Sequence, residues 1–483
     1  MNLKIKNIKE TDCTCDVLIL LFTEGNPVQY KHLSPSLTKL IKRIFSKEFC
    51  GKQNEVLLVP APEDIKPERI LFVGLGKKND VTREKVRQAG GKSAVYLKDK
   101  GIRKIGLSTQ ILASLKLSPV DFAEGSFMGL YAFRKYLNGK GKKTIDSITV
   151  LSEGSEGFQK KLNEVKTITS AVSFAKDLVN TPANDMTPSH LAEVARSLRK
   201  RKISVKVIEK RAIRKLGMGS YLSVAKGSNQ PPKFIILHYH GAKNPPVVLI
   251  GKSITFDSGG LSLKPADGME KMKYDMAGGA AVLGVIKAVS ELTLPVNLIA
   301  ILPATENLIG GSATRPGDVV QAIDGKTIEI ISTDAEGRMT LADAIGYAKR
   351  FKPGLIVDIA TLTGACSIAL GNVTIAMMGN DRDVMKKLVE SGNNTYERVW
   401  EMPLFEEYKE SIKSDIADFK NTGGRTGSLI SSAYFLSEFA GKTPWVHLDI
   451  AGTAWSDKDK PYTPKGASGV GVRLLFDLIN NLK

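Results

Sequence analysis

Two carboxylates, a glycine and a guanidinium lie within five residues of one another at Asp334, Glu336, Gly337 and Arg338. Residues 326–331 before them alternate in polarity, which predicts a strand, and the apolar spacing after them predicts a helix. A turn that joins a strand to a helix is where an α/β sheet holds its ligands. Two carboxylates this close repel each other unless a cation lies between them, and hard divalent cations prefer such oxygens. The run therefore predicts a metal site.

A second set of residues suited to the same chemistry lies upstream, among glycine-rich turns. It comprises Lys252, Asp257, Lys264 and Asp275. The two sets together provide four carboxylates, two lysines and one arginine. None of the five histidines stands in a His-Glu-x-x-His or similar metal-binding pattern. Any metal site must therefore be built mainly from carboxylates.

The stretch from Val248 to Ala281 and the Thr-Asp-Ala-Glu-Gly-Arg run at 333–338 resemble the leucyl aminopeptidase family, the two-metal cytosol aminopeptidases. The likeness is dense from Asn180 to the end of the chain and sparse before it. The departures are mild and remove no ligand: Ser253 replaces the usual glycine, Ser332 the usual asparagine and Met339 the usual leucine.

The resemblance implies that Asp257 and Glu336 bridge two divalent ions, manganese or zinc. Asp275 and Lys252 would complete the ligands of one ion, and Asp334 those of the other. A charged ammonium has no lone pair, so Lys252 can bind a metal only if the adjacent dications lower its pKa strongly. A hydroxide held between two such ions can attack a carbonyl that the ions polarise.

The resemblance also assigns roles to two basic residues and to a substrate pocket. Lys264 would stabilise the oxyanion of the tetrahedral intermediate. Arg338 would hold a bicarbonate that acts as the general base, since a guanidinium is not a base at neutral pH. The pocket would be lined by Met272, Thr361, Leu362 and Gly364. The implied enzyme is a homohexameric metal-dependent aminopeptidase that removes leucine and other apolar residues from peptides with a free N-terminus.

Purely structural interpretations also exist for these residues. A single carboxylate is often a helix cap or a surface charge, Arg338 could form a structural salt bridge, and Met272 could belong to the core. The net charge of +19, from 69 Lys and Arg against 50 Asp and Glu, suits nucleic acid as a second partner, although a lysine-rich surface explains it as well. No helix-turn-helix, RNA-recognition or zinc-finger pattern supports nucleic-acid binding. Phosphoester hydrolysis at the same two-metal site is a third hypothesis.

The elements that must position these residues are predicted to form two α/β domains. Residues 1–157 alternate strands with helices, which favours a parallel or mostly parallel sheet. The family likeness implies a macro-like fold there, with a role in assembly or regulation. A helix at 158–179 would link it to a larger catalytic domain, 180–483, whose apolar strands predict a central sheet, mostly parallel or mixed and buried on both faces.

Composition sets the broad class. A hydrophobic fraction of 42% and a charged fraction of 25% are those of an ordinary globular protein, and 483 residues suffice for two or three domains. The four cysteines form no disulfide framework, which favours a reducing compartment. No signal peptide and no apolar run long enough to span a membrane is apparent. We therefore expect a cytoplasmic protein without a membrane partner.

Overall fold

The computed structural model describes residues 1–26, 30, 33–138, 144–152 and 156–482. His32, one of the five histidines, lies outside the described residues. Two compact units are formed. The first comprises Met1–Thr169 with Lys458–Lys465, and the second comprises Ser170–Asp457 with Gly466–Lys483. The division falls within the long helix α5, Glu156–Asn180, which covers the helix predicted at 158–179.

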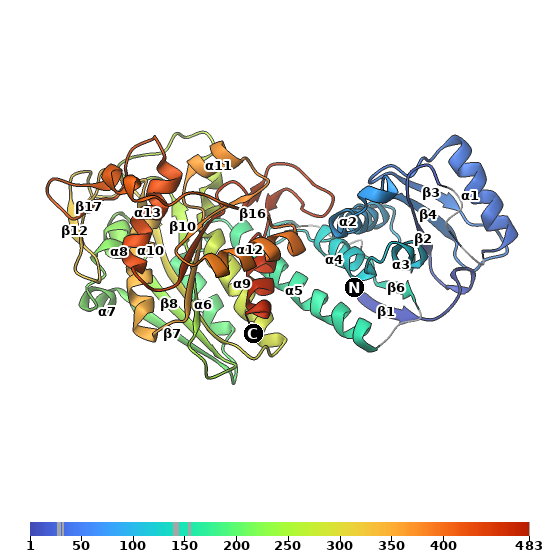
Figure 1. The fold of residues 1–483 in the computed structure, drawn as a ribbon, viewed down its shortest axis with the longest axis horizontal. Helices are drawn as coiled ribbons and strands as arrows, with labels where there is room; N and C mark the ends of the chain where they lie inside the picture. Colours follow the sequence, from blue (N-terminus) through green and yellow to red (C-terminus); the bar gives the residue numbers. More distant parts are fainter. Residues whose placement is uncertain (27–29, 31–32, 139–143, 153–155, 483) are drawn as a thin grey trace. The chain divides into compact units, whose positions relative to one another are not determined.

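The first unit is built on a six-stranded sheet in the order β1-β6-β5-β2-β4-β3, parallel except for the pair β3 and β4. Its strands are β1 (Asn2–Lys6), β2 (Val17–Phe22), β3 (Val56–Pro60), β4 (Arg69–Gly74), β5 (Lys104–Ser108) and β6 (Ser147–Leu151). Its helices, besides the start of α5, are α1 (Pro35–Lys47), α2 (Arg83–Asp99), α3 (Gln110–Ser114) and α4 (Pro119–Gly129) (Figure 1). The mostly parallel sheet predicted from the sequence is confirmed.

The central strand β2 shows why this sheet reads as an unbroken apolar run. Val17, Ile19 and Leu21 belong to one hydrophobic cluster, and Leu18 and Phe22 belong to another. Because successive side chains of a strand point to opposite faces, each face of β2 needs its own apolar set. The edge strand β1 was not predicted. Its alternate residues are exposed, and two of them are lysines, so only Leu3 and Ile5 mark its apolar face, too short a pattern to identify a strand.

The second unit holds a mixed nine-stranded sheet in the order β16-β15-β18-β14-β9-β11-β8-β7, with β10 paired to the end of β11. Its strands are β7 (Ile203–Glu209), β8 (Lys233–His240), β9 (Val247–Gly251), β10 (Ser253–Asp257), β11 (Asn297–Asn307), β14 (Leu355–Ala360), β15 (Ile375–Gly379), β16 (Val399–Glu401) and β18 (Trp445–Asp449). Strands β18, β14, β9 and β11 run parallel, and β8 and β15 are antiparallel to them. The predicted central sheet is confirmed as mixed.

Helices surround this sheet and carry the residues that close the site (Figure 1). They are α6 (Pro188–Ser197), α7 (Lys210–Lys215), α8 (Gly219–Val224), α9 (Ala277–Glu291), α10 (Glu336–Ala348), α11 (Gly364–Leu370), α12 (Arg382–Thr395), α13 (Ser428–Ala440) and α14 (Val472–Asn481). Helix α9 packs closely against β9. A Cβ added to Gly251 would lie only 2.4 Å from the Cα of Gly279, so only glycine fits there. Among the described residues, no helix has the length and apolar character that crossing a bilayer requires.

Two small sheets complete the second unit. One joins β12 (Val319–Gln321), β13 (Thr327–Glu329) and β17 (Phe419–Lys420), and the other is the two-stranded ladder of β19 (Trp455–Ser456) with β20 (Gly466–Ala467). The strand predicted at 326–331 is β13, so it belongs to a small sheet and not to the central one. Only three of its residues pair, and it is followed by the turn that carries the first acidic motif.

Candidate metal centre

The predicted ligands converge at the carboxyl ends of the central parallel strands. Lys252 stands directly after β9, where its backbone bonds to Ile359 of β14 and to Gly279 of α9, and Asp257 ends β10. Asp275 lies in the helical turn before α9, and Glu336 is the first residue of α10. Parallel strands that end at one edge bring residues from distant parts of the chain together, as this class of sheet does at its ligand sites.

The side chains meet through two lysine ammonium groups. Lys252 Nζ lies 2.7 Å from Asp275 Oδ1 and 2.8 Å from Glu336 Oε1. Lys264 Nζ lies 2.8 Å from Asp257 Oδ2 and 2.5 Å from Asp334 Oδ1. All five predicted ligands and the predicted oxyanion donor are therefore within one connected cluster of charges.

The donor set fits divalent cations. One carboxylate oxygen each from Asp257, Asp334 and Glu336 lies within 4.8 Å of the others, so one ion could contact all three. Two buried carboxylate oxygens, Asp275 Oδ2 and Glu336 Oε2, have no hydrogen-bond partner among the described residues. A buried acceptor without a partner is rare in native proteins and calls for an explanation such as an ion. These oxygens lie where the family likeness puts metal ligands.

Burial and neighbouring charges shift the pKa values of the side chains in the cluster. Burial, with repulsion from Glu336 second, raises the pKa of Asp257 to about 6. Burial also raises the pKa of the Asp275 carboxyl. For Lys252, burial alone would lower the pKa, but the surrounding carboxylates outweigh it and raise the pKa above its ordinary value. Displaced pKa values that gather in one cleft are typical of functional sites.

Glycine makes room for one of these side chains. A Cβ on Gly337 would lie 2.5 Å from Lys252 Cε and 2.7 Å from its Nζ, so any larger residue at 337 would displace the lysine. The Gly-Arg pair of the acidic motif is therefore explained partly by packing. At the upstream turn, Gly259 and Gly260 adopt φ angles of +87° and +63°, and Gly259 O accepts a hydrogen bond from Thr333 Oγ1. That bond ties the two motifs together.

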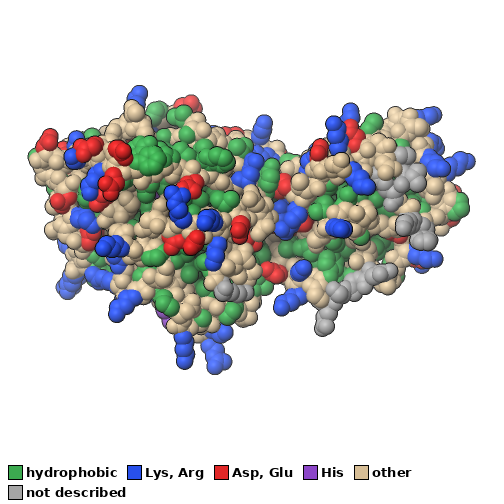
Figure 2. Space-filling view, in the orientation of Figure 1, with side chains coloured by type: hydrophobic (Ala, Val, Ile, Leu, Met, Phe, Trp, Pro, Cys, Tyr) green, Lys and Arg blue, Asp and Glu red, His purple; other side chains and the backbone are tan. Residues whose placement is uncertain are grey.

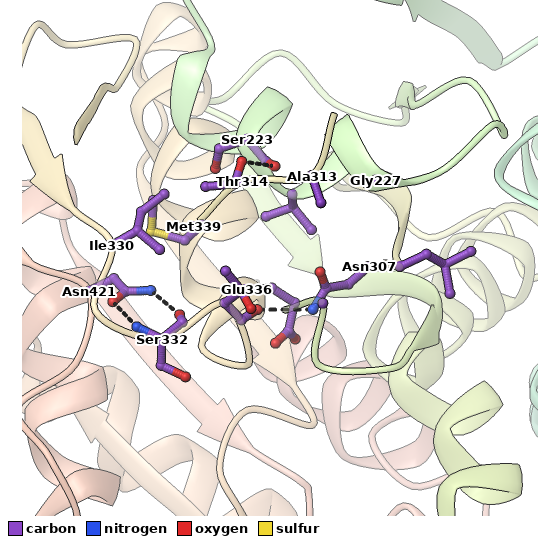
Figure 3. Close-up of a pocket in the computed structure, with 14 residues that line it drawn as sticks. Ser223, Gly227, Asn307, Ala313, Thr314, Ile330, Ser332, Glu336, Met339 and Asn421 are labelled. Carbon is purple, nitrogen blue, oxygen red and sulfur yellow. Dashed lines mark hydrogen bonds between the residues drawn. The ribbon is translucent and has the colours of Figure 1, made fainter. Parts of the chain in front are cut away.

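Two asparagines outside the predicted set of site residues support the site. Asn307, at the end of β11, donates from Nδ2 to Asp257 Oδ1 (2.8 Å) and to Thr333 O (3.0 Å). The Asn421 side chain bonds to the backbone of Ser332, and Figure 3 shows the two asparagines on opposite sides of Glu336. No local pattern marks these roles, although an asparagine that ends a buried strand is a usable signal.

Arg338 is buried on helix α10. Its Nη1 donates to Asn421 O at 2.8 Å, and its Nε has no partner among the described residues. Burial lowers the pKa of the guanidinium to about 10, so it still carries its charge at neutral pH. A buried cation with an unused donor suits a small anion.

The loop after β14 holds the opposite side of the cluster. Thr361 Oγ1 donates to Asp275 Oδ1 at 2.8 Å, and Thr361 O accepts from Lys252 Nζ at 3.0 Å. The buried carboxylate of Asp449 fixes this loop: its Oδ1 accepts from Leu362 N and its Oδ2 from Thr363 N, both at 3.1 Å. Of the other predicted pocket residues, Leu362 packs against the main core and Gly364 begins α11.

A cavity of about 760 Å³ opens over the cluster. Lys264 and Asp334 line it, so it leads directly to the charged groups. Met272, the predicted side-chain contact, lines it as well. Its wall also contains Tyr274, Ala451, Gly452 and Trp455. The cavity offers apolar side chains together with the charged groups of Lys264 and Asp334 to one bound molecule.

Comparison with known proteins gives matches along nearly the whole chain. The model of the cytosol aminopeptidase family catalytic domain matches residues 173–476, and that of the family's N-terminal domain matches residues 20–140. A probable cytosol aminopeptidase of Geobacter sulfurreducens is 44% identical over 492 residues, covering 99% of both chains. Another, of Geotalea uraniireducens, is 47% identical over 446 residues, with 90% of each chain covered. Among solved structures, the bottromycin maturation enzyme BotP in complex with Mn aligns with a TM-score of 0.86 and 31% identity, covering 97% of this chain and 99% of that one.

Proposed function

The chain belongs to the cytosol aminopeptidase family, and on that premise we propose that it removes leucine and other apolar residues from the N-terminus of peptides. The observation that carries the proposal is the convergence of Lys252, Asp257, Asp275, Asp334 and Glu336 beneath one open cavity. Phosphoester hydrolysis, the alternative for the same site, has no comparable support, because the family is one of peptidases.

We assign the ligands as the resemblance implies: Asp257 and Glu336 shared between two cations, Asp275 and Lys252 on one, and Asp334 on the other. When bound, two divalent cations would polarise the substrate carbonyl and provide a hydroxide nucleophile at neutral pH. Lys252 is held as an ammonium by Asp275 and Glu336, so it must lose its proton before its nitrogen can serve as a ligand. Manganese and zinc both suit this mixture of oxygens and one nitrogen, and the solved relative BotP was studied with Mn.

The basic residues act on the substrate side. Lys264 is one-fifth exposed and faces the cavity, so its ammonium can donate to the oxyanion that develops on the scissile carbonyl. Arg338 would hold bicarbonate through its unused Nε donor, and the anion would accept the proton that a guanidinium does not accept. The thioether of Met272 and the methyl of Ala451 offer an apolar wall, which supports the preference for leucine-sized side chains.

Assembly and location follow the family premise. We propose a cytoplasmic location, in keeping with the name of the relatives, and a homohexamer, which rests on the family resemblance alone. Nucleic-acid binding as a secondary function rests on the charge of +19 alone. On the face of the second unit shown in Figure 2, lysine and arginine stand among acidic side chains and form no continuous stripe. A binding curve on duplex DNA at physiological salt tests it, and affinity no better than ordinary non-specific binding would count against it.

The experiment for the main proposal is hydrolysis of leucyl-p-nitroanilide by purified protein with manganese, with zinc and after chelation. The N-acetylated substrate controls for the need of a free amine. Lys264→Ala is compared with Lys271→Ala, a lysine on the wall of the same cavity that pairs with Asp457. Metal-dependent cleavage of the free-amine substrate, lost only in Lys264→Ala, is the expected result. A folded protein that cleaves neither substrate under any metal would refute the proposal.

A further inference from the structure

A histidine and an aspartate face each other across two parallel strands of the central sheet. His447 of β18 is in register with Asp358 of β14, and both side chains are fully buried. His447 Nδ1 lies 2.5 Å from Asp358 Oδ1, and Asp358 Oδ2 accepts from the indole Nε1 of Trp445 at 2.7 Å. Because a carboxylate oxygen accepts, Nδ1 carries the hydrogen of this bond, and Nε2 is the free nitrogen of the ring.

The free nitrogen, His447 Nε2, is buried and has no hydrogen-bond partner among the described residues. The ring itself is held in place. Asp358 binds its other nitrogen, and the rings of Trp445 and His447 stack with their centroids 6.4 Å apart. A buried polar atom without a partner is rare, and a bound water or ion is the usual explanation. The fold therefore fixes the direction of Nε2 and leaves the atom open.

Arg338 presents a second open donor. Its side chain is buried, and its Nε has no partner among the described residues. His447 shares a sheet face with Trp445, which packs in the same core cluster as Met339, the residue after Arg338 on α10. Burial and then, more weakly, the positive charge of Arg338 act to lower the pKa of His447. The guanidinium and the imidazole therefore belong to one buried electrostatic network.

The charges around His447 favour an imidazolium beside a bound anion. Burial is the largest influence on its pKa and lowers it, but Asp358 and Asp449 outweigh burial and raise the pKa above its ordinary value. An imidazolium carries a hydrogen on Nε2 as well as on Nδ1. Two open N–H groups on charged side chains then bind a small anion more strongly than either would alone. The same two charges would repel a cation.

We propose that His447, oriented by Asp358, is a further residue of the anion site at Arg338, where His447 Nε2 and Arg338 Nε together hold one planar oxyanion. The inference rests on the bicarbonate that the proposed function assigns to Arg338. A single guanidinium N–H would let such an anion turn about one hydrogen bond. A second donor from another element fixes which of its oxygens faces the cavity, and a proton acceptor serves hydrolysis only in the right orientation.

The test measures bicarbonate binding by calorimetry on the full chain loaded with manganese and freed of excess metal. His447→Asn keeps a donor for Asp358 but lacks the Nε2 atom, and His447→Gln places an amide nitrogen near the position of Nε2. Arg338→Ala identifies the site, because it should abolish the binding. His238→Asn, the same substitution at a half-buried histidine of β8 whose Nε2 bonds to Asn297, is the matched control.

We expect the Kd for bicarbonate to rise about tenfold or more in His447→Asn, as loss of a hydrogen bond to a charged group allows. The rise should be smaller in His447→Gln and absent in His238→Asn. With leucyl-p-nitroanilide as substrate, the bicarbonate concentration for half-maximal activity should rise by the same factor. At saturating bicarbonate, kcat should return to within about threefold of wild type, since the metal ligands are untouched.

Unchanged bicarbonate affinity in His447→Asn would overturn the inference. A loss in His447→Gln as large as that in His447→Asn would trace the effect to the contact with Asp358, and a lower kcat with an unchanged bicarbonate requirement would show a structural role only. Both results also overturn it.

The peptidase function fails separately from this inference. A wild type that binds bicarbonate through Arg338 and His447 but cleaves no peptide would refute the proposed function and support the anion site. A wild type that cleaves leucyl-p-nitroanilide without binding bicarbonate would overturn the anion site and leave the peptidase function intact.

Discussion

Replacing Asp449 with asparagine should damage catalysis far more than stability, although Asp449 contacts none of the proposed metal ligands. Its buried carboxylate receives four donors: Oδ1 from Leu362 N and Ala451 N, and Oδ2 from the backbone and the hydroxyl of Thr363. An asparagine has only one acceptor atom. In either orientation of the amide, at least one backbone N–H of these loops faces an NH₂ group and loses its acceptor.

The structure allows both effects to be sized. A buried donor left without an acceptor costs about 1–3 kcal/mol. Part of this loss is offset, because burial raises the pKa of the Asp449 carboxyl and asparagine removes that buried charge. We therefore expect Tm to fall by no more than about 5 °C. The loop carries Thr361, which contacts both Asp275 and Lys252, and a displacement near 1 Å can lower a rate by about 100-fold.

The assay is kcat/KM for leucyl-p-nitroanilide beside thermal unfolding of Asp449→Asn. The control is Asp381→Asn, which should leave kcat/KM unchanged. Asp381 caps helix α12 by accepting from two backbone N–H groups. A hundredfold loss of kcat/KM is expected in the first variant. If Asp449→Asn keeps kcat/KM within about threefold of wild type, the carboxylate does not position the loop and the reasoning is refuted.

Three further predictions concern the candidate metal centre and helix α10. Lys264→Ala should lower kcat by about 10²–10³, as loss of an oxyanion donor does, and stopped-flow hydrolysis would check it. Gly337→Ala should abolish manganese-dependent activity, because the new methyl overlaps Lys252 Cε and Nζ; calorimetric manganese binding equal to wild type would contradict this. Burial raises the pKa of the Asp343 carboxyl to about 7, although hydrogen bonds from two backbone N–H groups lower it. The pKa in the unfolded chain is about 3.9. The stabilisation that Asp343 contributes is then fully present below pH 4 and is lost as the pH rises through 7. The free energy of unfolding measured with urea should therefore fall from pH 5 to pH 8, and Asp343→Asn should flatten that trend.

The sequence predicted the central elements of the fold because their burial leaves a clear pattern. Strands β9 and β14 are buried on both faces, and their apolar runs, interrupted only by Asp358 in β14, show it. Edge strand β1 was missed because three of its five residues are polar and exposed, which leaves only two apolar residues to mark the alternation. Strand β13 was expected at a ligand-binding edge of the main sheet. It belongs instead to a small sheet, and a strand with only three paired residues does not show in its sequence which strand it pairs with.

The sequence indicated which side chains converge at the candidate site, but not the residues that support them. Asp334 and Glu336 stand close in sequence, and charge repulsion alone suggested a cation between them. Asn307, Asn421 and Asp449 act on residues 50 to 89 positions away, a spacing that only the completed fold creates. The roles proposed for the ligands themselves stay predictions until metal is measured.

The most direct test is therefore the number of manganese ions bound per chain, measured by mass spectrometry of metal content in parallel with peptide hydrolysis. The wild type should bind two ions, and activity should return only as the second ion binds to the chelated protein. Asp257→Asn, which alters a ligand proposed for both ions, should lose metal and activity together. Full hydrolysis of leucyl-p-nitroanilide by metal-free protein, or by Asp257→Asn without bound ions, would contradict a two-metal aminopeptidase.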